Sequence, residues 1–461
     1  MEDHWDLVGR AVRAFREEIR ERPVATDVAA AELREDLDRT FGDFAVGRPL
    51  PEVVRHVSRM MRDGNVQTTH PRYFGLFNPA VLPAAEAGEA LAAAWNPQLA
   101  VWSHAPAANE IERHTLRFFL RRFGFDPDAA AASFTTGGAE ANLSAVLAAL
   151  ARAFPAWAEE GLAALPGPVG IYLSAESHDS FDKVARMTGL GRGALRAIPV
   201  DASFSMDPAR LEARLARDRQ RGRRPLMVVG TAGTTSAGAV DPLDDLGRIA
   251  REAGAWFHVD AAWGGVAALV PRLARVLAGI ERADSVTFDA HKGLSVPMGA
   301  GMFLCRDPDA VARAFSVRAS YMPGSVRDTT DPYLTSVQWS RRFIGMKVFA
   351  VLAELGESGL AAILERQADL GDRLRERLLA AGWRVVSDTP LPLVCFTHPR
   401  IEAGEIGVHE VARRVLDSGR AWVSVVRPGE PPVLALRACI TSFETTDEDL
   451  AILVSTLDAS V

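Results

Sequence analysis

Short apolar runs alternate with longer amphipathic stretches through the middle of the chain. A short apolar run between turn residues is typical of a buried strand, and apolar positions spaced three or four apart predict a helix. Over residues 76–345 this alternation predicts a large α/β domain, in which a mostly parallel sheet has helices on both faces. The strand-like runs are VGIYLS, ALRAIPV, LMVVGT, AWFHVD, SVTFDA and GAGMFLC.

The two ends of the chain have different patterns. Residues 1–75 have mostly helical patterns with charged faces, as in AVRAFREEIRERP. Short helices cannot bury an apolar stripe alone, so we expect an N-terminal helical arm that packs on the rest of the chain or on a second subunit. In residues 346–461, long helical stretches lead into WRVVS, LVCFTH, VSVVR and VLALRACI, which predicts a small C-terminal α+β domain.

Composition narrows the class of protein. The chain has 461 residues, 48% of them hydrophobic, so it can bury a large core. Its net charge of −7 comes without a basic stripe, which argues against a nucleic-acid partner. No apolar run approaches the roughly 18 residues that span a bilayer, and the first residues lack the features of a signal peptide. We therefore expect a soluble, cytoplasmic enzyme with no membrane partner.

The cysteines and histidines give no sign of a metal site. Cys305, Cys395 and Cys439 are odd in number, far apart and embedded in apolar runs, so we expect buried free thiols. The ten histidines form no HExxH motif, and the cysteines form no CxxC pair. We expect that no metal takes part.

Two polar residues at the ends of strand-like runs predict a cofactor site. Asp260 ends the run AWFHVD, and Lys292 follows DSVTFD within the sequence DAHK. The carboxyl ends of parallel strands form the edge of an open sheet where ligands bind. A lysine in a dry pocket can form a Schiff base with an aldehyde cofactor, and a buried acid can keep the cofactor's pyridine nitrogen protonated. The pair therefore indicates pyridoxal phosphate. His258 lies on the same strand face as Asp260, and we expect it to be a hydrogen-bonded core histidine.

Eight motifs follow one another from about residue 70 to the C-terminal half: HPRYFGLF, TTGGAEAN, SHDSFDK, GTTSAGAVD, HVDAAWGG, DAHK, ASYM and SRRF. In this order they resemble the group II pyridoxal phosphate-dependent amino acid decarboxylases, the family of the aromatic amino acid, glutamate and diaminobutyrate decarboxylases. Ordered motifs are far more specific than any single one. The resemblance implies fold type I, with a seven-stranded sheet in the large domain, and a homodimer across which the arm is exchanged.

The stretch TTGGAEAN opens a predicted helix, and its glycines let backbone N–H groups approach an anion at the positive end of that helix. The resemblance implies that Gly138 and Ala139 bind the cofactor phosphate, assisted by polar groups of Asp289 and His291. Asp289 departs from the family, which carries an asparagine at this position.

The resemblance also implies which residues hold the cofactor ring. Asp260 would pair with the pyridine nitrogen, and Ala262 would pack beneath the ring. His178 would lie flat on the opposite face, where it can help to orient the substrate carboxylate. Thr235 would contact the cofactor, although both of its neighbours in the sequence compete for that role.

The proton donor of the reaction is expected on a loop. Tyr321, in ASYMPGSVRDTTDPY, falls where the family carries a tyrosine that protonates Cα after carbon dioxide leaves. The glycine, proline and polar residues of this stretch suit a mobile lid. Relatives with phenylalanine at this position make aldehydes instead, so Tyr321 favours a true decarboxylase.

Four further residues match family positions that contact the substrate, namely Phe77, Asn78, Trp102 and Arg437. The alternation of VLALRACI turns Arg437 inward, where either a substrate or a structural carboxylate must pair with its charge. Gly293 replaces the bulky aromatic residue that often follows the lysine, which weakens an assignment to the aromatic branch. The side chain of the substrate stays open.

Decarboxylation of an L-amino acid to its amine and carbon dioxide, through an external aldimine, is the leading hypothesis. A decarboxylating aldehyde synthase and a carbon–carbon lyase of the sphingoid-base phosphate type share the cofactor chemistry. A non-catalytic paralogue that only binds pyridoxal phosphate is a third reading, although such a protein would be expected to lose Lys292, Asp260 or Tyr321, which are all present.

Overall fold

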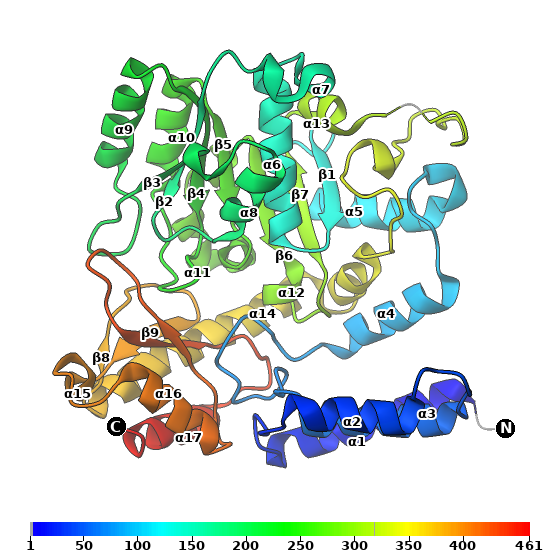
Figure 1. The fold of residues 1–461 in the computed structure, drawn as a ribbon, viewed down its shortest axis with the longest axis vertical. Coiled ribbons are helices and arrows are strands. Elements are labelled where there is room, and N and C mark those ends of the chain that lie inside the picture. Colours follow the sequence, from blue (N-terminus) through cyan, green and yellow to red (C-terminus); the bar gives the residue numbers. More distant parts are fainter. Residues whose placement is uncertain (1–2, 318) are drawn as a thin grey trace.

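The computed structural model describes residues 3–317 and 319–461. A seven-stranded sheet with the order β1-β7-β6-β5-β4-β2-β3 forms its centre (Figure 1). β7 is antiparallel to β1 and β6, and the other neighbours pair in parallel, which confirms the predicted mostly parallel sheet. The strands are β1 (Ala131–Thr135), β2 (Val169–Ser174), β3 (Leu195–Ile198), β4 (Arg224–Thr231), β5 (Trp256–Asp260), β6 (Ser285–Asp289) and β7 (Gly301–Cys305).

Alternate residues of the central strands face two helical layers, as the two-residue period of a strand requires. Met227 and Val229 of β4 pack in a cluster with helices on one face of the sheet, α6 (Gly138–Ala153), α8 (Ser180–Met187) and α13 (Pro308–Phe315). Val228 packs in a second cluster on the other face, with α5 (Pro106–Arg122), α10 (Leu243–Ala253) and α14 (Gly345–Ala380). Helices of the large domain are α4 (Pro83–Trp95), α5 (Pro106–Arg122), α6 (Gly138–Ala153), α7 (Trp157–Glu160), α8 (Ser180–Met187), α9 (Pro208–Gln220), α10 (Leu243–Ala253), α11 (Pro271–Ala274), α12 (Ala290–Gly293) and α13 (Pro308–Phe315).

Strand β1 is not among the runs that the sequence predicts. Its sequence, AASFT, starts with two alanines and a serine, so the residue types that mark a strand are confined to its last two positions, Phe134 and Thr135. Pairing along the whole length of β7 supplies the hydrogen bonds that its composition does not suggest. The strand matters for function because it leads directly into the turn before α6.

A second sheet, antiparallel and in the order β10-β11-β9-β8, forms the small C-terminal domain. The long helix α14 (Gly345–Ala380) joins the domains, packing on α4 and α5 at its start and under the small sheet at its end. It bends at Gly356, whose φ of 63° is left-handed. The remaining elements are β8 (Arg384–Val385), β9 (Leu393–Thr397), α15 (Pro399–Glu402), α16 (Val408–Asp417), β10 (Ser424–Val426), β11 (Ala435–Cys439) and α17 (Asp447–Asp458).

The N-terminal arm consists of α1 (His4–Glu18), α2 (Ala30–Phe41) and α3 (Leu50–Gly64), which lie beside the body of the molecule (Figure 1). None of these helices buries a residue. The arm is fastened where Arg20 pairs with Asp449 of α17, with 3.0 Å between Nη1 and Oδ2. Part of the apolar stripe of α1, namely Trp5, Val8 and Val12, stays exposed.

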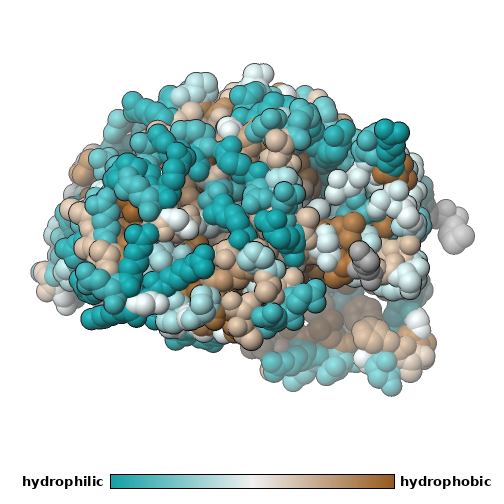
Figure 2. Space-filling view, turned by 90° about the horizontal axis from the view of Figure 1, so that it is seen from above, coloured by the Kyte–Doolittle hydropathy of each residue, from teal (hydrophilic) through white to brown (hydrophobic). Residues whose placement is uncertain are grey.

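The three cysteines are buried and free, as the sequence predicts. Within the described ranges, no helix is long and apolar enough to cross a membrane. Hydrophilic side chains cover much of the face seen in Figure 2, with smaller apolar patches between them.

Candidate active site

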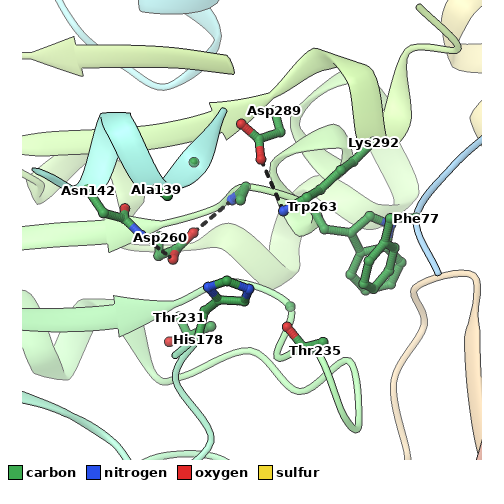
Figure 3. Close-up of a pocket in the computed structure, with 13 residues that line it drawn as sticks. Phe77, Ala139, Asn142, His178, Thr231, Thr235, Asp260, Trp263, Asp289 and Lys292 are labelled. Atoms are coloured by element: carbon green, nitrogen blue, oxygen red, sulfur yellow. Dashed lines mark hydrogen bonds and ion pairs between the residues drawn. The ribbon is translucent and has the colours of Figure 1, made fainter. Parts of the chain in front are cut away.

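The carboxyl ends of β4, β5 and β6 open onto a hollow of about 470 Å³, which includes space open to solvent. Sequence prediction and structure agree on most of its walls, and Figure 3 shows the polar side chains converging there. The predicted residues that line it are Phe77, Gly138, Ala139, His178, Thr235, Asp260, Ala262, Asp289 and Lys292.

Lys292 enters this cavity from α12, the single turn that follows β6. Its Nζ lies 3.0 Å from Oδ2 of Asp289, the last residue of that strand. The chain contains only two other lysines. Lys183 is exposed on α8, and Lys347 pairs with Glu89 at 2.6 Å. Lys292 is therefore the lysine that can meet a ligand in this cavity.

Asp260 is fixed from two sides. Its Oδ1 accepts a hydrogen bond from the backbone N–H of Ala262 at 3.1 Å, and its Oδ2 accepts one from Asn142 Nδ2 at 2.9 Å. Only 5% of Asp260 is exposed. The carboxylate is thus held with its charge close to the cavity, as a group that pairs with a protonated ring nitrogen must be.

A buried relay orients the amide of Asn142. Because Asp260 can only accept, Nδ2 of Asn142 faces it, and Oδ1 faces His258 Nε2 at 3.0 Å and Thr287 Oγ1 at 2.8 Å. His258 Nε2 must then be the donor, and Nδ1 contacts Ser285 Oγ at 2.8 Å. Burial lowers the pKa of His258 to about 4, so the ring is neutral at pH 7. This confirms that His258 is a hydrogen-bonded core histidine.

The other end of the cavity suits an anion. α6 begins at Gly138, so the N–H groups of Gly138 and Ala139 have no acceptor within the helix and carry its positive end. The next N–H groups, those of Glu140 and Ala141, donate to the carbonyl of Gly137. A Cβ on Gly138 would lie 3.1 Å from Asp289 Oδ2, and one on Gly301 would lie 2.7 Å from Asp289 Oδ1. At Gly301 a Cβ would also lie 2.6 Å from the Cα of Gly137, so glycine is required there, whereas a side chain at position 138 would have to displace the Asp289 carboxylate slightly.

The residues present fit pyridoxal phosphate. Lys292 supplies an amine for its aldehyde, Asp260 a carboxylate for its ring nitrogen, and the start of α6 a set of N–H donors for its phosphate. A buried carboxylate oxygen, Oδ1 of Asp289, has no hydrogen-bond partner among the described residues. Such an orphaned polar atom beside an anion site marks a place where a ligand is expected to complete the hydrogen bonding.

His291 lies behind the cavity wall instead of lining it. Its Nδ1 accepts a hydrogen bond from Ala300 N at 3.2 Å, and its Nε2 lies 3.8 Å from Asp289 Oδ2. Burial lowers the pKa of His291.

Three other predicted residues lie outside the cavity walls. Tyr321 is 76% exposed, and its ring packs 6.1 Å from that of Trp339. Trp102 donates from Nε1 to Glu110 at 2.9 Å, and Asn78 contacts the sulfur of Met298 at 3.3 Å. In a single chain, the structure therefore does not bring these side chains to Lys292.

Arg437 is inward-facing, as predicted, but a structural carboxylate, one of its two expected partners, does not pair with it among the described residues. Its guanidinium donates to the backbone carbonyls of Thr235 at 2.5 Å and Gly75 at 2.6 Å, and it stacks 5.3 Å above the ring of Phe77. Only 2% of the residue is exposed. Carbonyl dipoles and an aromatic face thus replace the carboxylate, and they fix two walls of the cavity to the small domain.

The sequence interpretation missed four lining residues. Asn142 lies one helical turn beyond Gly138, so the four-residue spacing within TTGGAEAN could have revealed it. Trp263 follows Ala262 and packs 4.7 Å from Phe77. Thr231 ends β4 and Gly233 follows it; only the strand order places them beside Asp260.

Comparison with known proteins agrees with this geometry. The family profile described as the pyridoxal-dependent decarboxylase conserved domain matches residues 40–398. Acidic amino acid decarboxylase GADL1 of Bos taurus is 29% identical over 444 residues, which cover 93% of this chain and 84% of that protein. L-2,4-diaminobutyrate decarboxylase of Rhizobium meliloti is 33% identical over 326 residues, which cover 68% of this chain and 64% of that protein.

Solved structures show the same fold. Mouse CSAD in its apo form superimposes with a TM-score of 0.90 at 25% identity, covering 98% of both chains. Oryza sativa TDC with pyridoxal phosphate and tryptamine gives a TM-score of 0.91 at 23% identity, covering 99% of this chain and 98% of that one. The profile match and the shared fold together show that the chain belongs to the pyridoxal-dependent decarboxylases, which are enzymes with fold type I and pyridoxal phosphate as cofactor.

Proposed function

We propose that this enzyme decarboxylates an L-amino acid to the corresponding amine, with Lys292 as the residue that bonds the cofactor. The observation that carries this proposal is the meeting of Lys292, Asp260 and the start of α6 in one cavity. These groups match the aldehyde, the ring nitrogen and the phosphate of the cofactor, respectively.

Each residue has a distinct task in this proposal. When bound, the cofactor withdraws electrons from the substrate Cα through its ring. Asp260 keeps the ring nitrogen protonated, and Gly138 and Ala139 bind the phosphate with the first N–H groups of α6. Ala262 and His178 enclose the ring, and Thr235 contacts it from the loop after β4. His178, which is exposed at the cavity, helps to orient the carboxylate that leaves.

Tyr321 is the proposed proton donor to Cα. Because it is exposed and packs on Trp339 in the single chain, it has to reach a cavity by movement of its loop or from a second subunit. We therefore propose a homodimer in which the N-terminal arm covers a second copy. The unburied helices of the arm and their exposed apolar residues Trp5, Val8 and Val12 support this.

The substrate side chain is expected to meet Phe77. Asn78, Trp102 and Arg437 are also predicted to contact the substrate, but they do not line the cavity of a single chain. The packed rings of Phe77 and Trp263 favour an apolar or aromatic group. Named relatives act on acidic amino acids, aromatic amino acids and diaminobutyrate, so all three classes are candidates.

A substrate screen tests the proposal. The purified, cofactor-loaded enzyme is offered the twenty common amino acids, ornithine, diaminobutyrate and dihydroxyphenylalanine, while carbon dioxide, amine and hydrogen peroxide are followed. Carbon dioxide with a stoichiometric amine supports decarboxylation and identifies the substrate class. Carbon dioxide with peroxide and aldehyde would favour the aldehyde synthase alternative. A spectral change without carbon dioxide from any amino acid would contradict both and favour a lyase.

A further inference from the structure

Asp289 is unusual because it places a carboxylate at the anion end of the cavity. It ends β6 and is 1% exposed, and its Oδ2 would lie 3.1 Å from a Cβ on Gly138, the first residue of α6. A phosphate bound by the first turn of that helix would have to share this space with a negative charge. Two anions in contact within a buried site repel each other strongly.

Among the described residues, Lys292 is the one cation beside the Asp289 carboxylate. Nζ of Lys292 lies 3.0 Å from Oδ2. His291 Nε2 lies 3.8 Å from the same oxygen, but burial lowers the pKa of this histidine, so it is neutral at pH 7. β1, β7 and α6 present only neutral groups to the carboxylate, namely Thr135, Gly301 and Gly138.

Lys292 is also the group that bonds to the cofactor aldehyde. Before its nitrogen can attack an aldehyde, the ammonium must lose a proton, and after the bond forms it is no longer available as the counter-ion of Asp289. The second oxygen of Asp289, Oδ1, has no hydrogen-bond partner among the described residues. A buried carboxylate in this position would be left without charge compensation beside a phosphate.

We propose that Asp289 is the base that takes the proton from Lys292 and that it stays protonated while the cofactor is bound. An ammonium and a carboxylate become an amine and a carboxylic acid. The amine then adds to the aldehyde carbon and water leaves, so no oxidant or reductant is needed. The neutral acid donates a hydrogen bond to the phosphate instead of repelling it, which resolves the conflict between two anions.

Proton counting tests this proposal independently of turnover. Heats of pyridoxal phosphate binding are measured at one pH in two buffers of different ionisation enthalpy, for the wild type and for Asp289→Asn. We expect the wild type to retain about one more proton than the variant on binding. The cofactor dissociation constant of the wild type should accordingly rise up to about tenfold more per pH unit than that of Asp289→Asn.

Asp309→Asn provides a matched control, because Asp309 is exposed on α13 and its replacement removes the same charge. This variant should retain protons like the wild type. Equal proton counts for the wild type and Asp289→Asn would overturn the proposal, because Asp289 would then stay ionised beside the phosphate.

A second measurement covers the case in which Asp289→Asn does not bind the cofactor. The infrared difference spectrum between cofactor-loaded and cofactor-free wild type should contain the carbonyl stretch of a newly protonated carboxylic acid. Its absence would overturn the proposal. The inference rests on the proposed cofactor site but not on the substrate: a protein that binds pyridoxal phosphate and decarboxylates nothing would contradict the proposed function and leave the role of Asp289 intact.

Discussion

At the scale of single residues, the cavity depends on a few charged side chains whose neighbours give them their roles. Lys292 faces Asp289, and Asp260 is held by Asn142 and a backbone N–H. The same residue types elsewhere have ordinary structural roles, as when Lys347 pairs with Glu89. The position of Lys292 in the cavity beside Asp289, more than its residue type, makes it a candidate reactive group.

Replacement of Lys292 tests its identity as the cofactor lysine. Lys292→Ala should lower the turnover rate by roughly a thousandfold or more, because no amine remains to bond the aldehyde. Borohydride reduction followed by peptide mapping should place the pyridoxyl label on Lys292 in the wild type, and the variant should carry none. Lys183→Ala serves as the control, since Lys183 is an exposed lysine outside the cavity. A label on Lys183 or Lys347 would contradict the assignment.

Replacement of Tyr321 tests the proton donor. Tyr321→Phe keeps the ring that packs on Trp339 but removes the hydroxyl, so Cα should go unprotonated and react with oxygen. The product should shift from amine toward aldehyde, ammonia and hydrogen peroxide, measured by chromatography and a peroxide assay. Tyr333→Phe is the matched control, because Tyr333 also packs on Trp339, at 5.0 Å, but is buried. Unchanged amine formation in Tyr321→Phe would rule out this donor.

At the scale of the elements, one helix and two strands hold the cofactor site in place. α6 crosses the sheet, and Asn142 on its first turns bonds to Asp260 of β5, Thr287 of β6 and His258 of β5. The same helix presents its N–H groups to the phosphate. Its position therefore couples the two ends of the cofactor, and the relay through Asn142 fixes that position.

Loss of the Asn142 amide should weaken cofactor binding without abolishing it. In Asn142→Leu the carboxylate of Asp260 loses one of its two fixed hydrogen bonds, which costs about 1–3 kcal/mol for a buried group. The dissociation constant of pyridoxal phosphate, measured by absorbance titration, should rise about tenfold or more.

Asn109→Leu is the control for this experiment. It removes a buried amide that bonds to the carbonyls of Val101 and Ala105, away from the cavity. It should lower the unfolding temperature in a similar way but leave the cofactor dissociation constant unchanged. An equal loss of affinity in both variants would mean that the effect is general destabilisation.

At the scale of the whole molecule, a single chain leaves the arm and the ring of Tyr321 without a surface that buries them. The helices of the arm bury no residue, although α1 and α3 are strongly amphipathic in sequence. Tyr321 is likewise 76% exposed. A second copy would give both features a place to pack.

Charge on the apolar face of α1 should therefore disrupt assembly. Val8 and Val12 are exposed by 41% and 37%, and they lie one turn apart on that face. The double variant Val8→Asp with Val12→Asp should shift the protein from dimer to monomer in light scattering coupled to size-exclusion chromatography, and activity should fall with it. Arg13→Asp changes the net charge by the same two units at an exposed position on the opposite face and should leave the dimer intact. A wild-type monomer would contradict the proposed assembly.

The sequence by itself determined the class of fold and the chemical centre. Apolar runs and their period specify strands and helices locally, so the parallel sheet, the small domain and the arm could be predicted from the pattern. Lys292 and Asp260 could be predicted because each directly follows or ends a buried strand, and parallel strands bring their carboxyl ends to one edge.

Only the tertiary structure decided the contacts that span long stretches of chain. Asn142 and Asp260 are 118 residues apart, and the carbonyl partners of Arg437 lie more than 200 residues away, so no local pattern could pair them. The composition of β1 did not mark it as a strand, because its stability comes from pairing with β7. Local periodicity therefore fixed the elements and the reacting groups, whereas their hydrogen-bond partners, including the pairing of Asp289 with Lys292 beside α6, required the folded chain.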